Sequence, residues 1–385
     1  MANRWCDGFG RYGGDTAKML NGSSGQAWAQ ADHLTTGATT TGWHLSSANP
    51  RTGTHHLRQN EQGVASWARR VFGAPLTEVF FGHAVHFSEL PIKELAPGTM
   101  VSLTNNGGIC LASFRDQANA VQLSVWLGTD GSLVVYQGGF QSGSFFVGTL
   151  LARSIPIIGA GAYQHIEYYA KAGTADGAIE IRVDEVSRLN LTGIDTLYQA
   201  STEFSQVAMG SGGAEVLGTL GTGVWDVADC YVNDTVDDGS GASTWLGDVK
   251  SGCQLVNADT AQADFALSAG VLGYPLLGQA PPDDGTYIDT AATTARSDFG
   301  LEDTPANLSE IITVRPFVRA MKDDAGTATI APNMLSGSSE GTVSDQPITT
   351  AFAYYDSNVP LDPATGAPWT KSGLDAAFEV VERVT

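Results

Sequence analysis

The sequence predicts an all-β protein made of two antiparallel β-sandwich (jelly-roll) domains, and three observations lead to this fold class. Short aromatic and β-branched segments recur about every 8–12 residues, with turn signals between them. Segments with the period of an amphipathic helix are scarce. The chain has 385 residues, which exceeds the roughly 250–300 residues that one hydrophobic core usually serves.

The predicted strands of the first half are rich in apolar, aromatic and β-branched side chains. In chain order they are 79–87, 100–103, 108–114, 121–127, 133–136, 149–152, 164–171, 179–183, 207–209 and 224–232. We expect two hairpins among them, one through the turn Thr129–Ser132 and one through the turn Thr174–Gly177. Both hairpins predict antiparallel pairing.

The second of these hairpins indicates a sheet that is packed on one side only. Its apolar positions alternate with polar ones along both strands, which is typical of a sheet with one buried and one solvated face. The apolar set is Ile166, Tyr168, Ala170, Ile179, Ile181 and Val183, and the other set is His165, Glu167, Tyr169, Lys171, Glu180, Arg182 and Asp184.

A polar segment rich in Gly, Ser and Asp divides the chain. It predicts a first domain at 1–235, a linker at 236–244 and a second domain at 245–385. In the second half we expect a strand at Trp245–Val249 and a hairpin that joins Ile311–Ala320 to Ala328–Ile330. Pro316 within this hairpin predicts a bulge or an edge position.

Two short helices are expected. One is at Ala17–Leu20, and the other is near Lys371–Phe378, where Thr370 or Ser372 would be the N-cap.

The charge of the chain narrows the class of partner. A formal net charge of −21, from 41 acidic and 20 basic residues, argues against nucleic acid and anionic membranes, because Lys and Arg hold such partners. The charge predicts solubility, with cation binding or spacing between crowded copies as alternatives.

The N-terminus has no secretory signal pattern, and no apolar run approaches the roughly 20 residues of a membrane span. We therefore expect a protein made in a cytoplasm and not inserted into a membrane.

The four cysteines, Cys6, Cys110, Cys230 and Cys253, form no pattern of zinc ligands. Free, buried thiols are expected, and a Cys230–Cys253 disulfide remains an alternative.

The sequence predicts no catalytic, cofactor-binding or metal-binding residue, no cofactor and no enzyme activity. A retaining glycosidase needs two carboxylates about 5–5.5 Å apart, and the best candidate row, Glu180 and Asp184, is interrupted by Arg182. Asp226 and Asp229 are interpreted as turn residues, with calcium binding as the alternative. The acidic pairs Asp237–Asp238, Asp283–Asp284 and Asp323–Asp324 are interpreted in the same way.

The histidines and glycines also lack a functional pattern. His83 and His86 would point to opposite faces of a strand, and so would His55 and His56. The glycine runs lack the Gly-Lys-Ser/Thr that ends a phosphate loop.

Several further segments combine strand, turn and glycine patterns, namely Arg4–Tyr12, Tyr163–Tyr169, Gly177–Asp184, Leu191–Thr196, Trp225–Asp234, Trp245–Val249, Pro281–Tyr287, Tyr354–Tyr355, Asp362–Gly366, Trp369–Thr370 and Leu374–Glu382. Together these segments resemble tailed-bacteriophage virion structural proteins that contain a concanavalin A-like (laminin G-like) jelly-roll domain. The resemblance implies that the first domain is concanavalin A-like. It transfers no site residue. The chain departs from the family at Cys6, Cys230 and the glycine-rich tract 210–223.

The main functional prediction is a structural protein on the exterior of a phage particle, as a tail fibre, head fibre, spike or decoration subunit. Its partners would be capsid or tail proteins and further copies of itself, joined by an apolar or aromatic face. Trp5, Trp28, Trp43 and Trp67 are candidates for this face, with ordinary core packing as the alternative. One alternative is a glycan-binding module that attaches to a host surface glycan, with Tyr168–Tyr169 or Tyr354–Tyr355 stacking on sugars. A polysaccharide-degrading enzyme is the other alternative.

Overall fold

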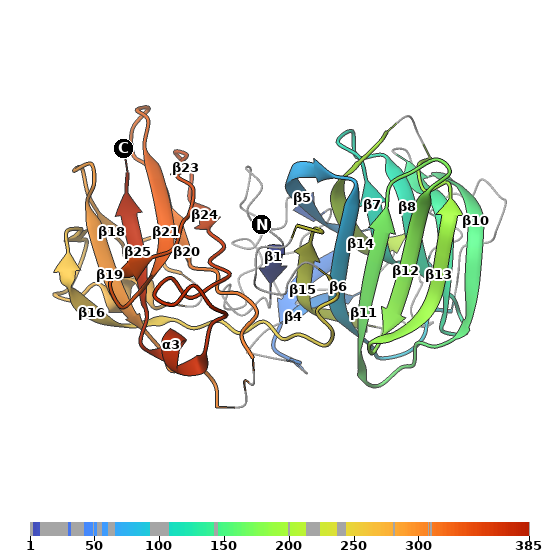
Figure 1. Ribbon diagram of the computed structural model, residues 1–385, viewed down its shortest axis with the longest axis horizontal. Coiled ribbons are helices and arrows are strands. Elements are labelled where there is room, and N and C mark those ends of the chain that lie inside the picture. Colours follow the sequence, from blue (N-terminus) through green and yellow to red (C-terminus); the bar gives the residue numbers. More distant parts are fainter. Residues whose placement is uncertain are drawn as a thin grey trace.

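The computed structural model describes residues 3–7, 30–31, 42–48, 50–51, 56–60, 66–92, 108–141, 145–198, 201–212, 224–236, 244–279, 282–306, 308 and 310–384. The described chain is nearly all β and antiparallel (Figure 1). The predicted all-β sandwich class is confirmed.

The first part of the chain forms two large sheets, called sheet A and sheet B. The eight strands of sheet A are β1 (Asn3–Asp7), β3 (Gly42–Ser46), β4 (His56–Asn60), β6 (Glu78–Phe87), β11 (Tyr163–Lys171), β12 (Gly177–Val183), β13 (Val186–Ile194) and β15 (Val224–Asn233). Their order is β13-β12-β11-β6-β15-β4-β3, and β1 also pairs with β15. Neighbours in the sheet are thus often far apart in the sequence.

Sheet B has seven strands in the order β10-β9-β8-β7-β14-β5-β2. These strands are β2 (Gln30–Ala31), β5 (Ser66–Leu76), β7 (Gly108–Arg115), β8 (Val121–Leu127), β9 (Ser132–Gln141), β10 (Phe145–Pro156) and β14 (Phe204–Gly212). The two predicted hairpins are confirmed, since β8 pairs with β9 and β11 pairs with β12.

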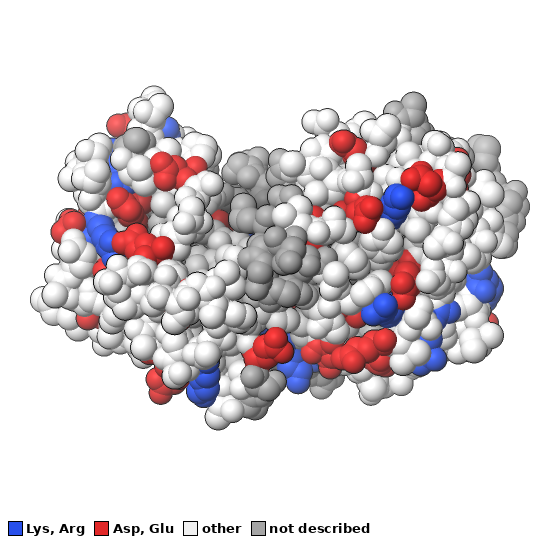
Figure 2. All heavy atoms as spheres, viewed as in Figure 1, with Lys and Arg blue, Asp and Glu red and all other residues white. Residues whose placement is uncertain are grey.

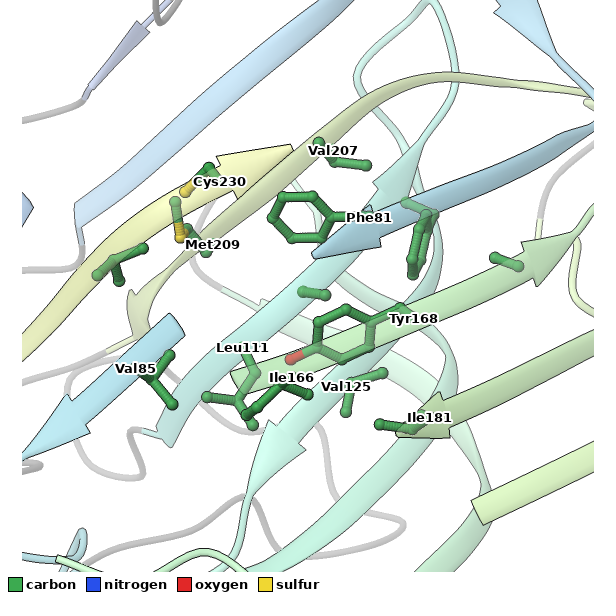
Figure 3. Packing of buried hydrophobic residues seen from close by; sticks show 14 of the residues in the cluster. Phe81, Val85, Leu111, Val125, Ile166, Tyr168, Ile181, Val207, Met209 and Cys230 are labelled. Atoms are coloured by element: carbon green, nitrogen blue, oxygen red, sulfur yellow. The ribbon is translucent and has the colours of Figure 1, made fainter. Parts of the chain in front are cut away.

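The core lies between sheets A and B. Phe81, Ile166 and Tyr168 from sheet A pack in one buried cluster with Leu111 and Val125 from sheet B (Figure 3). All five side chains are fully buried. Burying one such side chain contributes about 1.5–3 kcal/mol, so this cluster fixes which face of each strand is inward.

Alternation along β6 sends its two histidines to opposite faces, as predicted. His83 points inward, where its Nε2 lies 3.0 Å from the carbonyl oxygen of Leu111 in sheet B. His86 lies on the outer face of sheet A, and its side chain is partly exposed. The outer face of sheet A therefore carries the odd-numbered polar side chains of β11 and their cross-strand neighbours.

The second part of the chain forms a smaller sandwich. Sheet C has the order β16-β19-β25-β21-β22, and β23 pairs with β21. Its strands are β16 (Val256–Ala263), β19 (Arg296–Leu301), β21 (Thr329–Ser336), β22 (Ser339–Glu340), β23 (Gln346–Pro347) and β25 (Phe378–Arg383). Two further pairs join β17 (Ala266–Leu267) to β18 (Ile288–Asp289) and β20 (Phe317–Ala320) to β24 (Ala353–Asp356). Ala353 and Tyr355 of β24 pack with Phe299, Ile330 and Val381 of sheet C.

Helix α3 (Lys371–Asp375) is confirmed where a helix was expected. Thr370 is its N-cap and accepts a hydrogen bond from the Gly373 amide. Helix α2 (Tyr274–Leu277) was not predicted. No described helix is long and apolar enough to cross a membrane.

Two predictions for the second half are wrong. Residues 245–249 form no strand, because their backbone amides bond to side chains of sheet A. The hairpin between 311–320 and 328–330 does not form, since β20 pairs with β24 while β21 pairs with β25. Pro316 lies just before β20, outside any ladder.

Other predictions fall outside the described residues, namely the strand at 100–103, the helix at 17–20 and most of the linker at 236–244. The domain boundaries stay a prediction. Cys230 and Cys253 are not joined by a disulfide in the structure, so the Cys230–Cys253 alternative is excluded.

Candidate functional site

Four side chains form a row across the outer face of sheet A, at the open ends of its central strands. The register pairs Tyr163 of β11 with His86 of β6, His86 with Asp226 of β15, and Asp226 with Arg58 of β4. Directly opposite residues in an antiparallel pair have Cβ atoms about 4.5–5.5 Å apart. We call Tyr163, His86, Asp226 and Arg58 the outer row.

Asp226 is the centre of the outer row, and its side chain is completely buried. Its two carboxylate oxygens accept hydrogen bonds from Arg58 Nε at 2.6 Å and Arg58 Nη2 at 2.9 Å. The Nε2 atom of His56 lies 2.9 Å from Asp226 Oδ1, and His86 Nδ1 lies 3.3 Å from Asp226 Oδ2. One carboxylate therefore holds a guanidinium group in two-point geometry and faces two imidazoles.

The electrostatics of the row follow from burial and pairing. Burial alone would raise the pKa of Asp226, but the contacts with His56 and Arg58 hold it below its usual value. The hydrogen bonds to Asp226 raise the pKa of Arg58 against the effect of burial. Burial, followed by the carboxylates of Asp226 and Asp229, raises the pKa of Tyr163. The row thus contains a fixed ion pair beside a neutral phenol.

His165 lies two residues along β11 from Tyr163, on the same outer face. It is 2 % exposed, and neither ring nitrogen has a hydrogen-bond partner in the described part of the chain. Burial and then the charge of Arg51 lower its pKa to about 3, so the ring is neutral near neutral pH. Its ring stacks on Tyr231 with centroids 6.3 Å apart.

A second ion pair lies beside His165. Asp229 stands at a bulge of β15 with a φ of 51°, and its completely buried carboxylate is 2.8 Å from Arg51 Nη1. The other terminal nitrogen of Arg51 contacts Asp248. The prediction that Asp226 and Asp229 are turn residues is wrong, since both lie inside β15 and are ion-paired.

Residues 245–251, called the covering segment, lie against the outer face around Glu167. Glu167 anchors it, because its buried carboxylate accepts the amides of Leu246 at 3.0 Å and Gly247 at 2.9 Å, together with the Tyr231 hydroxyl. Gly82 makes this possible, since a Cβ there would lie 2.1 Å from Cε1 of Tyr231. Further along the sheet, Trp245 lies under the Arg182 guanidinium at 4.1 Å.

The predicted acidic row on β12 does not form a site. Arg182 Nε bonds Glu180 Oε1 at 2.9 Å, whereas Asp184 has a φ of 49° and accepts the His165 amide in the turn after β12. In the part of the chain that is described, no group of three or more His, Cys, Asp or Glu is placed to hold a metal ion.

Of the aromatic residues considered for stacking or assembly, most of the described ones are buried, while Tyr169 is half-buried on the outer face and donates a hydrogen bond to Glu78. Tyr168, Tyr354 and Tyr355 are at most 1 % exposed, so they cannot stack on an external sugar. Trp43 is buried against Trp225, with ring centroids 4.9 Å apart. Of the other predicted interface tryptophans, Trp67 is half-buried against Trp126, and the side chains of Trp5 and Trp28 lie outside the described part.

No protein-family model and no curated protein matches the chain. Among solved structures, it is similar to an endo-β-1,4-glucuronan lyase from the fungus Trichoderma reesei, with 15% identity and a TM-score of 0.37 over 50% of this chain and 86% of that one. It is similar to an alginate lyase from Aplysia kurodai, with 11% identity and a TM-score of 0.36 over 49% and 86% of the two chains. A carbohydrate-binding module from Bacillus subtilis matches with 11% identity and a TM-score of 0.27 over 51% and 97%.

At this level of similarity the likeness does not extend to activity or ligand. The prediction that the chain is not an enzyme is nevertheless contradicted, because the matched structures include several polysaccharide lyases.

Proposed function

We propose that this chain binds a polysaccharide across the outer face of sheet A, and that the outer row gives the site acid–base chemistry. The observation that carries the proposal is the row itself, in which a buried carboxylate holds an arginine by two hydrogen bonds and lies beside a histidine and a partly exposed tyrosine. Clusters of this kind, with perturbed pKa values, are enriched at functional sites.

The outer row offers hydrogen-bonding groups of both kinds to a ligand. Nη1 of Arg58 and Nε2 of His86 have no protein partner in the described chain, and neither atom is fully buried. The phenol of Tyr163 lies beside His86, with ring centroids 5.3 Å apart. Sugar hydroxyls both donate and accept hydrogen bonds, so they can bond to the guanidinium, the imidazole and the phenol.

The same geometry supports proton transfer. The carboxylate of Asp226 lies 3.3 Å from Nδ1 of His86, and the Nε2 atom remains for a ligand, so a carboxylate and an imidazole, the side chains most used in acid–base chemistry, lie side by side. Tyr163 keeps its proton near neutral pH because its pKa is raised, so in this site it would donate a proton and His86 would accept one.

The test is a panel of neutral and acidic polysaccharides in affinity gel electrophoresis. Product formation is followed as new reducing ends for hydrolysis and as ultraviolet absorbance of an unsaturated sugar for elimination. We expect His86→Ala to weaken binding by about 2- to 10-fold, the value of one hydrogen bond, and any turnover by roughly 10²-fold or more.

Lys171→Ala is the matched control. Lys171 lies on β11 at the far end of the same sheet face, where it pairs with Asp176 in solvent. The control should bind like the unmodified chain. If every polysaccharide runs past both proteins without retardation, or if the two variants lose binding equally, the outer row is not a glycan site.

The virion role stays a prediction that rests on the sequence resemblance. It is compatible with glycan binding, because a subunit on the exterior of a particle meets surface polysaccharides. Antibody labelling of purified particles tests it independently of the glycan panel, and the absence of labelling would remove it.

A further inference from the structure

The outer row is the exposed margin of the outer face of sheet A. The side chains of Arg58 and His86 are 14 % and 15 % exposed, and Tyr163 is partly exposed. Two residues further along each strand, on the same face, lie four residues that are at most 2 % exposed, namely His56, Ala228, Ala84 and His165. We call these four the inner row. The register pairs Ala228 with Ala84 and Ala84 with His165, so the inner row runs parallel to the outer row and is closed to solvent.

The covering segment lies on the far side of the inner row. Its Ser251 amide donates to Asp229 Oδ1 at 3.0 Å, and two further amides of the segment donate to Glu167. A ligand on the outer row therefore cannot follow the strands in this direction and stay in contact with sheet A. To contact Arg58, His86 and Tyr163 together, a ligand must lie across the strands, along the outer row.

The length of the outer row sets the length of ligand that it can contact. Tyr163 is on β11 and Arg58 is on β4, with β6 and β15 between them, so their Cα atoms are three strand spacings apart, about 14 Å. The rings of Tyr163 and His86, which are neighbours in the row, have centroids 5.3 Å apart. One sugar ring lengthens an extended polysaccharide by close to one strand spacing. The row therefore matches about three consecutive sugar units.

Hydrogen bonds, more than charge, give the row its direction. Figure 2 shows acidic and basic side chains spread over one face of the molecule, with wide uncharged areas between them. Charge alone would not select one direction for a long ligand on such a surface, whereas hydrogen bonds depend on the angle at donor and acceptor. The row supplies such groups through Arg58, His86 and Tyr163, one on each of three strands.

We infer that the ligand of the outer row is a linear glycan chain that lies across β4, β15, β6 and β11, and that the row contacts about three consecutive sugar units of it. The inference rests on the proposed glycan-binding function and specifies the stretch of ligand that the site recognises. Arg58 Nη1 contacts the unit at one end of this stretch, and the Tyr163 hydroxyl contacts the unit at the other end. His86 Nε2 contacts the unit between them.

The experiment measures how the affinity of the full chain depends on ligand length. Titration calorimetry is run with linear oligosaccharides of one to six units, in parallel series built from glucose, from mannose and from uronic acids. In at least one series, we expect each added unit to tighten binding by about 2- to 10-fold, the value of one hydrogen bond. The gain should stop at about three units, because longer chains extend past the row.

Variants at the two ends of the row test its direction. Tyr163→Phe removes only the hydroxyl, and Arg58→Lys keeps a cation beside Asp226 while removing Nη1. Each should move the end of the gain from about three units to about two. His86→Ala, in the middle of the row, should weaken binding of every chain of two or more units without moving the end of the gain. Lys171→Ala is again the control, and melting temperatures show that each variant is folded.

Three outcomes would overturn the inference, and they separate it from the proposed function. If one sugar unit binds as tightly as six, and binding is still weakened in His86→Ala, the glycan site stands and the extended stretch is refuted. If the folded variants Tyr163→Phe and Arg58→Lys leave the length dependence unchanged, the ligand does not cross the strands along the row. If neither oligosaccharides nor polysaccharides bind, the proposed function and this inference fall together.

Discussion

Replacing Asp226 by Asn tests whether the outer row is held by its buried carboxylate. The side chain is fully buried and accepts two hydrogen bonds from Arg58, which is itself 14 % exposed. Removing one partner of a buried ion pair costs about 3–5 kcal/mol, because it leaves the other charge unpaired. Arg58 retains some contact with water, so we take the lower value, about 3 kcal/mol.

A loss of about 3 kcal/mol corresponds to a fall in melting temperature of roughly 6–12 °C for a domain of this size. Urea unfolding followed by tryptophan fluorescence measures the loss in free energy of unfolding, since Trp225 neighbours Asp226 in β15. Asp130→Asn is the control with the same chemical change. Asp130 pairs with Arg153 but is 46 % exposed, so its loss should stay within about 1 kcal/mol.

The double variant Asp226→Asn with Arg58→Met separates the ion pair from the packing around it. Without the guanidinium group no charge is left unpaired, so a large part of the stability should return. Equal, small losses for Asp226→Asn and Asp130→Asn would refute the reasoning, because they would mean that water replaces the carboxylate at no cost.

Three further changes test the fold and its dependence on pH. Gly82→Ala should destabilise by about 1–3 kcal/mol through overpacking against Tyr231, and Gly82→Ala with Tyr231→Leu should recover stability in the same urea assay. Burial lowers the pKa of His83 from 6.5 to about 3, so only the unfolded chain takes up this proton between those values. Stability should therefore fall as pH drops through that window, and His83→Gln should reduce the slope of the urea midpoint against pH. Burial raises the pKa of Glu379 from 4.5 to about 8, so the pH dependence of stability from this group has the opposite sign. The folded chain keeps that proton, so stability should decline as pH rises from 4.5 to 8, and Glu379→Gln should remove this decline. A slope unchanged in either variant would contradict its assignment.

Strand positions in the first sandwich could be predicted because the inward face is apolar in an unbroken period of two. The alternation of Ile166, Tyr168 and Ala170 against polar neighbours depends only on which face is buried. The two confirmed hairpins need only a short turn between such strands. Both properties are local, and the sequence contains them directly.

The outer row could not be predicted, because its members are brought together by pairing between distant strands. Arg58 and Asp226 are 168 residues apart, and the β4–β15 register that joins them is not a local property. The sequence did contain one signal for this row, the two aspartates within an otherwise apolar strand. Asp is depleted in strands, so Asp226 and Asp229 at these positions indicate buried ion-pair partners better than they indicate a turn.

The second half was predicted less well for the same reason. β20 and β21 are near in sequence and separated by turn residues, which favours a hairpin, but β20 finds its partner in β24. The contacts of Tyr355 and Ala353 in the sandwich core stabilise that choice. Long-range packing therefore overrides the local turn signal in this part of the chain.

The two ends of the outer face of sheet A differ in a way that bears on function. At one end, the covering segment satisfies Glu167 and Tyr231 with two backbone amides, so the polar groups there are closed off within the protein. At the other end, Arg58, His86 and Tyr163 keep partial exposure although the carboxylate that pairs with Arg58 is buried. Within the described residues, one nitrogen of the His86 ring and one nitrogen of the Arg58 guanidinium have no hydrogen-bond partner there. This end of the face is therefore where the proposed glycan would bind.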